Sequence, residues 1–171
     1  MAWTDPFHMR QGAVGVPLEG IDVRIAPDGE VLVRGAAVTP GYLGASGETA
    51  AFDDGWLHTG DLGAVDTAGY LRIRGRKKDE IVTAEGVHVM PDEIEPVLEA
   101  LPGVREAAVV GHGAVGERVH AVLSLTKDAD ADAIVRQANA ALQGPRRIRE
   151  FSVWPGDRLP RTSTTGKLKR E

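Results

Sequence analysis

The sequence contains no cysteine among its 171 residues. This absence excludes disulfide bonds, thiolate ligands for metals and a cysteine nucleophile. No apolar run approaches the roughly 18–20 residues that a membrane-spanning helix requires, so we expect no transmembrane segment. The first ten residues include Asp5, Pro6 and His8 and lack the apolar centre of a secretory signal. A cytoplasmic location is therefore the default expectation.

Aromatic residues are also scarce, at 5%, but 42% of the chain is hydrophobic and 26% is charged, as in ordinary globular proteins. The length suits one compact domain or two small ones. The formal net charge is −5, yet residues 144–171 contain eight basic and only three acidic side chains. Such a basic end could attract nucleic acid, a membrane surface or a phosphorylated ligand, or it could be a solvated tail. The acidic remainder of the chain argues against nucleic acid as a partner.

Glycine and proline punctuate the first half of the chain, and apolar and polar residues alternate between them. Segments 21–25 and 31–34 show this alternation, and the turn 27–30 between them contains a proline and a glycine. This pattern predicts a β-hairpin. A second hairpin is expected over residues 61–74, around the turn 66–69. The first part of the chain is therefore expected to be rich in β-structure.

The second half shows helical spacing as well. Met90-Pro91-Asp92-Glu93 has the proline and acidic residues of a helix start, and apolar residues follow at helical spacing up to Pro102-Gly103. The pattern after residue 80 predicts a β-α-β-β-α-β order, typical of a small open sheet covered by helices. We expect strands at 104–111, 119–125 and 148–154 and a further helix at 130–142. The predicted class is α+β, with a β-rich part at 12–75, a hinge at 76–79 and a small domain at 80–171.

Two short stretches contain residues suited to nucleotide chemistry. In Thr59-Gly60-Asp61, a carboxylate follows a flexible residue at a strand edge. It could accept two hydrogen bonds from the vicinal diol of a ribose, or it could simply cap a turn. Arg76 offers a planar set of donors suited to ribose or phosphate. The alternative is that Arg76 and the lysines after it only solvate a linker.

The third stretch, residues 159–170, contains Gly166 followed by Lys167. Glycine allows the backbone to approach a ligand closely, and an ammonium on a long stem can reach negative charge on a phosphate. The same composition is also typical of a disordered basic tail. His58, next to Thr59, is expected to pack in a strand rather than to act as a base.

Taken singly these stretches are weak signals, but together their order and spacing resemble the carboxylate-activating, adenylate-forming (AMP-binding) enzymes. That superfamily includes acyl-CoA synthetases, the adenylation domains of peptide synthetases and luciferases. The resemblance extends from about Gly12 to Arg170. The sequence of residues 81–86 is most similar to that of long-chain acyl-CoA synthetases. The stretches that carry it are 29–35, 38–42, 56–62, 69–81, 90–95 and 159–170.

The resemblance implies a two-step reaction in which a carboxylate attacks ATP to give an acyl-adenylate, after which the thiol of CoA takes the acyl group. It implies that Asp61 binds the ribose and Arg76 the nucleotide, and that Lys78 is the hinge of a mobile C-terminal domain. Lys167 would reach the α-phosphate and the carboxylate during adenylation. Gly86 would line the path of the pantetheine thiol, unless it is an ordinary turn glycine.

The chain also departs from the family pattern. The phosphate-binding loop is absent, and so is the aromatic-Gly-Thr-Glu stretch that holds adenine and magnesium. We therefore expect the Mg²⁺ ligands and most of the acyl pocket to lie in a missing N-terminal domain, no metal site within this chain, and no turnover by the isolated chain. Thr164-Thr165 adds one residue before Gly166-Lys167, which leaves the exact reach of Lys167 open.

The resemblance favours the C-terminal part of an acyl-CoA synthetase, an acid–thiol ligase. Its expected partners are a small carboxylic acid, most readily a fatty acid, together with ATP, CoA and the missing domain. Two alternatives stay open at this point. The chain could be part of an adenylation domain that loads a carrier protein, or it could be a remnant that keeps the fold without the chemistry.

Overall fold

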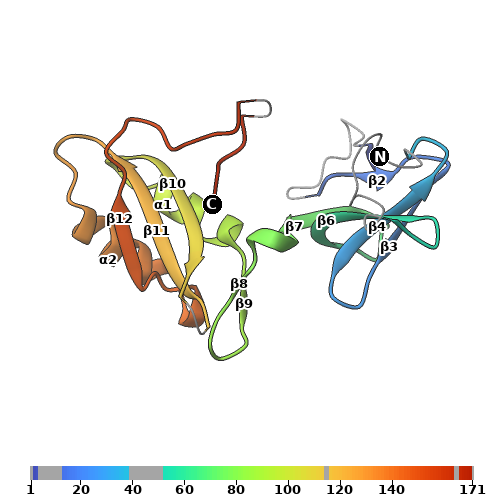
Figure 1. Ribbon diagram of the computed structural model, residues 1–171, viewed down its shortest axis with the longest axis horizontal. Helices are drawn as coiled ribbons and strands as arrows, with labels where there is room; N and C mark the ends of the chain where they lie inside the picture. Colours follow the sequence, from blue (N-terminus) through green and yellow to red (C-terminus); the bar gives the residue numbers. More distant parts are fainter. Residues whose placement is uncertain (1, 4–12, 39–51, 114–115, 164–165, 171) are drawn as a thin grey trace. The chain divides into compact units, whose positions relative to one another are not determined.

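The computed structural model describes residues 2–3, 13–38, 52–113, 116–163 and 166–170. The chain forms two compact units, Met1–Lys78 and Asp79–Glu171 (Figure 1). The division falls within the range 76–79 in which we expected a hinge. The first unit consists of sheets and the second combines a sheet with helices, which confirms the predicted α+β class.

The first unit is built on an antiparallel sheet of five strands. The order is β3-β4-β6-β5, and β7 also pairs with β6. A short ribbon of β1 (Ala2–Trp3) and β2 (Val16–Pro17) accompanies it. The strands of the sheet are β3 (Ile21–Ile25), β4 (Glu30–Gly35), β5 (Phe52–Asp53), β6 (Trp56–Val65) and β7 (Leu71–Arg76).

Both predicted hairpins are confirmed. Strands β3 and β4 are joined by a turn in which the Gly29 N–H donates to Ala26 O at 2.9 Å, with Gly29 at φ +87°. Strands β6 and β7 are joined by a turn whose Asp66 carboxylate accepts hydrogen bonds from two backbone N–H groups. Strand β6 is longer than predicted because it begins at Trp56, where it pairs with β5. Val31, Val33 and Leu71 form the small core beneath this sheet.

The second unit contains a three-stranded sheet, with β11 at its centre. β11 runs antiparallel to β10 and parallel to β12. A separate antiparallel ribbon of β8 and β9 precedes the sheet. The elements are β8 (Ile81–Val82), β9 (His88–Val89), α1 (Glu95–Glu99), β10 (Val104–His112), β11 (Arg118–Leu125), α2 (Ala131–Ala141) and β12 (Glu150–Val153). Three 3₁₀ turns complete the described chain, η2 (Lys77–Asp79), η3 (Pro91–Glu93) and η4 (Gly144–Arg146).

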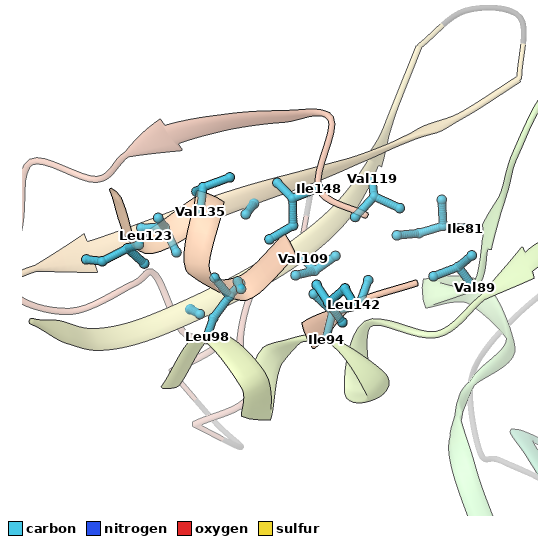
Figure 2. Packing of buried hydrophobic residues seen from close by; sticks show 14 residues of the cluster. Ile81, Val89, Ile94, Leu98, Val109, Val119, Leu123, Val135, Leu142 and Ile148 are labelled. Atoms are coloured by element: carbon cyan, nitrogen blue, oxygen red, sulfur yellow. The ribbon is translucent and has the colours of Figure 1, made fainter. Parts of the chain in front are cut away.

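The main core of the second unit lies between one face of this sheet and the two helices (Figure 2). Leu98 of α1 and Ala138 of α2 are completely buried there, together with Val109 and Leu123 of the sheet. Alternate residues of β10 and β11 point into this core, as expected for strands with one face covered. The unit therefore buries a continuous apolar cluster of its own.

The prediction of one continuous helix from Met90 to Pro102 is wrong. Residues 91–93 form a 3₁₀ turn, and the α-helix covers only Glu95–Glu99. The reason is Pro96, which has no N–H to donate and therefore cannot continue a helix that begins at Pro91. The second predicted helix is confirmed, with the Asp130 carboxylate accepting from the Ala133 N–H at its start.

The last predicted strand is also shorter than expected, since β12 begins at Glu150 rather than at Ile148. The side chain of Asn139, on α2, accepts from the Ile148 N–H at 2.8 Å and donates to the Ile148 carbonyl at 3.0 Å. Both backbone groups of Ile148 are thereby satisfied by a side chain, so this residue does not need a strand partner.

Candidate functional site

Asp61 and Arg76, the two residues predicted to bind a nucleotide, are direct partners across β6 and β7. Arg76 Nε lies 3.1 Å from Asp61 Oδ1, and Arg76 Nη1 donates to Thr59 O at 2.8 Å. Both side chains remain about a third or more exposed, at 32% for Asp61 and 42% for Arg76. The pair therefore presents an acceptor and a set of donors side by side on one accessible edge.

Irregular pairing around Asp61 shapes this edge. The β4–β6 register shifts between Glu30 and Leu32, and the β6–β7 register shifts between Leu62 and Gly63. Gly60 has φ +69°, which a residue with a side chain rarely adopts. The Thr59 hydroxyl donates to Val31 O at 2.7 Å and accepts from the Asp61 N–H at 3.1 Å. Bulges of this kind re-aim side chains, here the carboxylate of Asp61.

Glu30, which no sequence pattern singled out, lies behind this edge. Its side chain is only 5% exposed, and its carboxylate is close to three donors. It accepts from the Gly60 N–H at 2.9 Å and from Lys77 Nζ at 3.0 Å, and His58 Nδ1 lies 3.1 Å away. Burial acts to raise the pKa of Glu30, but these hydrogen bonds outweigh it and hold the pKa below its ordinary value. Glu30 lay in a stretch that carried the resemblance, but nothing in the sequence indicated its partners.

The two lysines at the end of the first unit differ in their surroundings. Lys77 Nζ contacts both Asp28 Oδ2, at 2.6 Å, and Glu30 Oε2. Hydrogen bonds to these two carboxylates raise the pKa of Lys77. Lys78 is exposed, and its ammonium has no hydrogen bond or ion pair with any described residue. Lys78, the predicted hinge, therefore directly follows Lys77, which two carboxylates hold in place.

Gly86 lies in the loop between β8 and β9. Its N–H donates to Thr83 O at 2.9 Å, and it has φ +73°. A Cβ built on Gly86 would have no described atom within 4 Å. The turn alone therefore accounts for a glycine here, and the open space around it is compatible with a path for a thiol arm.

A pocket of about 470 Å³ lies beside this loop, within the second unit. Its lining is mostly polar and carries both signs of charge. Arg118 and Arg149 are both exposed, and Arg118 pairs with Glu150 at 3.1 Å. The lining residues are Thr83, Ala84, Glu85, Gly116, Glu117, Arg118, Val119, Pro145, Arg149 and Glu150.

Lys167 lies on a closed loop rather than on a disordered tail. The loop is closed by a bridge between Arg161 and Leu168 and by the Thr162 N–H, which donates to Lys167 O at 2.8 Å. The Thr162 hydroxyl also accepts from the Lys167 N–H at 3.2 Å. The Lys167 ammonium is exposed and has no partner among the described residues. The extra threonine at 164–165 lies outside the described residues.

The start of this loop is fixed to the sheet face opposite the helices. Glu106, on β10, accepts from the Leu159 N–H at 2.7 Å and from Arg161 Nη2 at 3.0 Å. The Leu159 N–H and Arg161 together hold the pKa of Glu106 below its ordinary value, against a smaller opposing effect of burial. Leu159 itself is buried, at 4% exposure. The loop that carries Lys167 is thus anchored to the second unit.

The described residues contain neither a cluster of metal-ligating side chains nor a membrane-spanning helix. No three His, Cys, Asp or Glu side chains in the described ranges are grouped so that they could hold a metal ion. None of the described helices is long and apolar enough to cross a bilayer.

Comparison with known proteins links this geometry to one family. No protein-family model matches the chain. The chain is 40% identical over 186 residues to the long-chain-fatty-acid–CoA ligase FadD15 of Mycobacterium tuberculosis, covering 94% of this chain and 30% of that protein. It is 34% identical to the 2-succinylbenzoate–CoA ligase of Staphylococcus aureus, covering 99% and 35%. The chain belongs to the acyl-CoA ligases of the adenylate-forming superfamily.

A solved structure of another member of this family has the same fold. The o-succinylbenzoate CoA synthetase of Bacillus subtilis, in complex with an acyl-adenylate intermediate, superimposes with a TM-score of 0.82 at 34% identity. The matched region covers 93% of this chain and 34% of that one. Our chain thus spans only about a third of the length of the relatives that it matches.

Proposed function

We propose that this chain forms part of an ATP-dependent acyl-CoA synthetase, in which it supplies the ribose-binding edge and a mobile lysine-bearing domain. The overall reaction converts a carboxylate, ATP and CoA into an acyl-CoA, AMP and pyrophosphate. The similarity to FadD15, a long-chain-fatty-acid–CoA ligase, favours a fatty acid as the carboxylate. The names of the relatives favour CoA over a carrier protein as the acceptor.

In the first half-reaction, a carboxylate oxygen attacks the α-phosphorus of ATP, and the bond to the β-phosphate oxygen breaks to release pyrophosphate. Asp61 accepts hydrogen bonds from the ribose hydroxyls, and Arg76 contacts the nucleotide beside it. The Lys167 ammonium stabilises the negative charge that accumulates as two anions meet. This contribution is larger in the transition state than in the ground state, as catalysis requires.

In the second half-reaction, the thiol sulfur of CoA attacks the acyl carbon, AMP leaves and the thiol proton passes to solvent. Rotation about Lys78 removes Lys167 after adenylation and brings the Gly86 loop to the thiol path. Such domain movement is a common way to gate successive steps. A solved structure of the B. subtilis relative contains ATP and a magnesium ion. The magnesium ligands are expected outside this chain, so no step of the proposal is assigned to magnesium.

The observation that carries this proposal is the Asp61–Arg76 pair on one accessible edge. The Asp61 carboxylate can accept hydrogen bonds from a diol, and the Arg76 guanidinium can donate hydrogen bonds to a nucleotide. An anchored loop in the second unit, whose Lys167 ammonium has no partner among the described residues, supports it. An Asp buried in a turn, or a lysine engaged in a salt bridge, would have favoured a structural role instead.

The experiment uses a chimera in which this chain replaces the matching third of the B. subtilis o-succinylbenzoate CoA synthetase. We expect ATP–pyrophosphate exchange with o-succinylbenzoate. Lys167→Ala should reduce this exchange by about 10²–10³-fold, the typical loss for one group that stabilises developing charge. Thioester formation from the supplied acyl-adenylate should fall much less.

The matched control is Lys169→Ala, which removes a nearby exposed lysine from the same segment. It should leave exchange within about twofold of the unsubstituted chimera, as is usual for an exposed side chain. Equal exchange by the Lys167→Ala and unsubstituted chimeras, at matched stability, would refute the proposed role of Lys167. A folded chimera that binds no ATP would contradict the proposed function as a whole.

A further inference from the structure

One buried carboxylate connects two parts of the first unit that the proposed function treats separately. Glu30 Oε1 accepts from the Gly60 N–H, in the segment that carries Asp61. Glu30 Oε2 accepts from Lys77, the residue before the proposed hinge. These two donors flank the paired residues Asp61 and Arg76, and the Glu30 carboxylate binds both of them. Glu30 itself is too deeply buried to contact a nucleotide directly.

The contact with Gly60 bears on the aim of Asp61. Gly60 has a left-handed φ of +69°, and its partly buried N–H is satisfied by the Glu30 carboxylate. A Cβ on Gly60 would lie 3.6 Å from Arg76 Nη1, so the backbone at this point runs close to the guanidinium. A change in the Gly60 peptide would therefore alter the spacing of Asp61 and Arg76.

The contact with Lys77 bears on where the chain can bend. Lys77 is held by two carboxylates on the β3–β4 hairpin, Asp28 and Glu30. Solvent screens the attraction between Lys77 and the exposed Asp28, so that pair holds Lys77 only weakly. The attraction between Lys77 and the buried Glu30 is screened less. Glu30 thus fixes the last residue before Lys78 to the sheet.

From this arrangement we infer that Glu30 is a positioning residue, which sets the geometry of the ribose-binding edge through Gly60 and fixes the near side of the hinge through Lys77. This inference rests on the proposed function for its consequence in the reaction. The positioning itself can be tested without any activity, so failure of one can be distinguished from failure of the other.

The first test measures amide hydrogen exchange by NMR in the chain itself. Glu30→Gln keeps an oxygen that can accept from the Gly60 N–H but loses the charge, whereas Glu30→Ala loses both. We expect the Gly60 amide to exchange about tenfold faster or more in Glu30→Ala and to change little in Glu30→Gln, given the usual strength of one hydrogen bond. Equal protection of Gly60 in all three proteins would overturn the inference, whatever the activity.

The second test uses the chimera described above. Glu30→Ala should raise the KM for ATP in the exchange reaction by about tenfold, while Glu30→Gln stays within about twofold. Lys77→Met leaves the hydrogen bond between Glu30 and the Gly60 N–H in place, so it should raise that KM less than Glu30→Ala does, and it should slow thioester formation. A uniform loss of activity that follows thermal stability across the three variants would show that Glu30 acts on folding alone and would overturn the inference.

Asp22→Asn serves as the control in both tests. Asp22 is an exposed carboxylate of the same sheet that pairs with Arg34 at 2.9 Å. Its loss should change neither Gly60 exchange nor the KM for ATP. An unsubstituted chimera without exchange activity would count against the proposed function, and the amide exchange result would then decide the positioning role by itself.

Discussion

Arg170 and Glu95 form a bifurcated ion pair in which Arg170 Nη2 lies 2.8 and 2.9 Å from the two carboxylate oxygens. Arg170 also contacts Asp79, at 3.2 Å, the first residue of the second unit. Glu95 in turn accepts from the buried Val109 N–H of β10 at 2.8 Å. The hydrogen bonds to Glu95 raise the pKa of Arg170 despite its partial burial, which acts in the opposite direction. The segment after Lys167 is thereby fixed both to the core and to the far side of the proposed hinge.

Arg170→Met should therefore destabilise the second unit. Removing one partner leaves the carboxylate of Glu95 buried without its counter-ion, which typically costs about 3 kcal/mol. Urea unfolding of the chain, followed by the circular dichroism of its helices, measures this change. The signal reports the second unit because both described α-helices belong to it.

The double variant Arg170→Met, Glu95→Gln separates charge from packing. It should regain part of the lost stability, because no unpaired charge is then buried. If the single variant unfolds at the same urea concentration as the unsubstituted chain, Arg170 does not anchor this segment.

Arg76→Lys should weaken nucleotide binding in the chimera. The planar guanidinium reaches Asp61 and Thr59 O at the same time, and a single ammonium cannot reproduce that fork. We expect the KM for ATP in the exchange reaction to rise about tenfold, the equivalent of one good hydrogen bond. Arg34→Lys is the control, since Arg34 makes a similar exposed pair with Asp22 on the same sheet. The same KM for Arg76→Lys and the unsubstituted chimera would contradict the role of Arg76.

The hairpins and strands could be predicted from the sequence because local signals specify them. The turn residues around Gly29 and Asp66 fix where each hairpin reverses, and the second hairpin then brings Asp61 opposite Arg76. The helix near Pro91 was predicted as too long because the periodicity of apolar residues outweighed the effect of Pro96. Local signals also placed Lys167 after a flexible glycine without showing whether the segment was ordered.

Glu30 and Arg170 could not be predicted because their partners are remote in sequence. Glu30 meets Lys77 only after β4, β6 and β7 have paired, and Arg170 meets Glu95 only after the tail has crossed the second unit. A charged residue in a strand or a tail is usually solvated, so its type alone gave no reason to expect burial. Long-range ion pairs of this kind depend on the whole fold rather than on local spacing.

Gly86→Ala and Gly116→Ala should have different effects although both glycines have positive φ. A Cβ at Gly86 meets no described atom within 4 Å, so only backbone strain of about 1 kcal/mol is expected. A Cβ at Gly116 would lie 2.4 Å from Ala84 Cα, so the chain must move and the loss should be larger. Urea unfolding of the two variants tests this order. In the chimera, Gly86→Ala should slow thioester formation while leaving ATP–pyrophosphate exchange unchanged, and an equal loss in both reactions would argue against a thiol path at Gly86.

The anchoring of the Lys167 loop should weaken in acid. The Leu159 N–H and Arg161 hold the pKa of Glu106 in the folded chain below its ordinary 4.5. A carboxyl group with a lowered folded pKa contributes stability that is fully present above the unfolded value and is lost as the pH falls through the folded value. Amide exchange of Leu159 should therefore accelerate, relative to its intrinsic rate, as the pH is lowered from about 6 to about 3.

Glu106→Gln provides the test of this assignment. The amide keeps an oxygen that can accept from the Leu159 N–H but does not titrate. Its Leu159 exchange, corrected for the intrinsic rate, should be nearly independent of pH in the same range. If the Gln variant shows the same acid dependence as the unsubstituted chain, another group is responsible, and Glu106 does not control the loop. The loop carries Lys167, so control of the loop by Glu106 would have a consequence for activity. As the pH is lowered, ATP–pyrophosphate exchange by the chimera should fall at a higher pH than exchange by its Glu106→Gln variant.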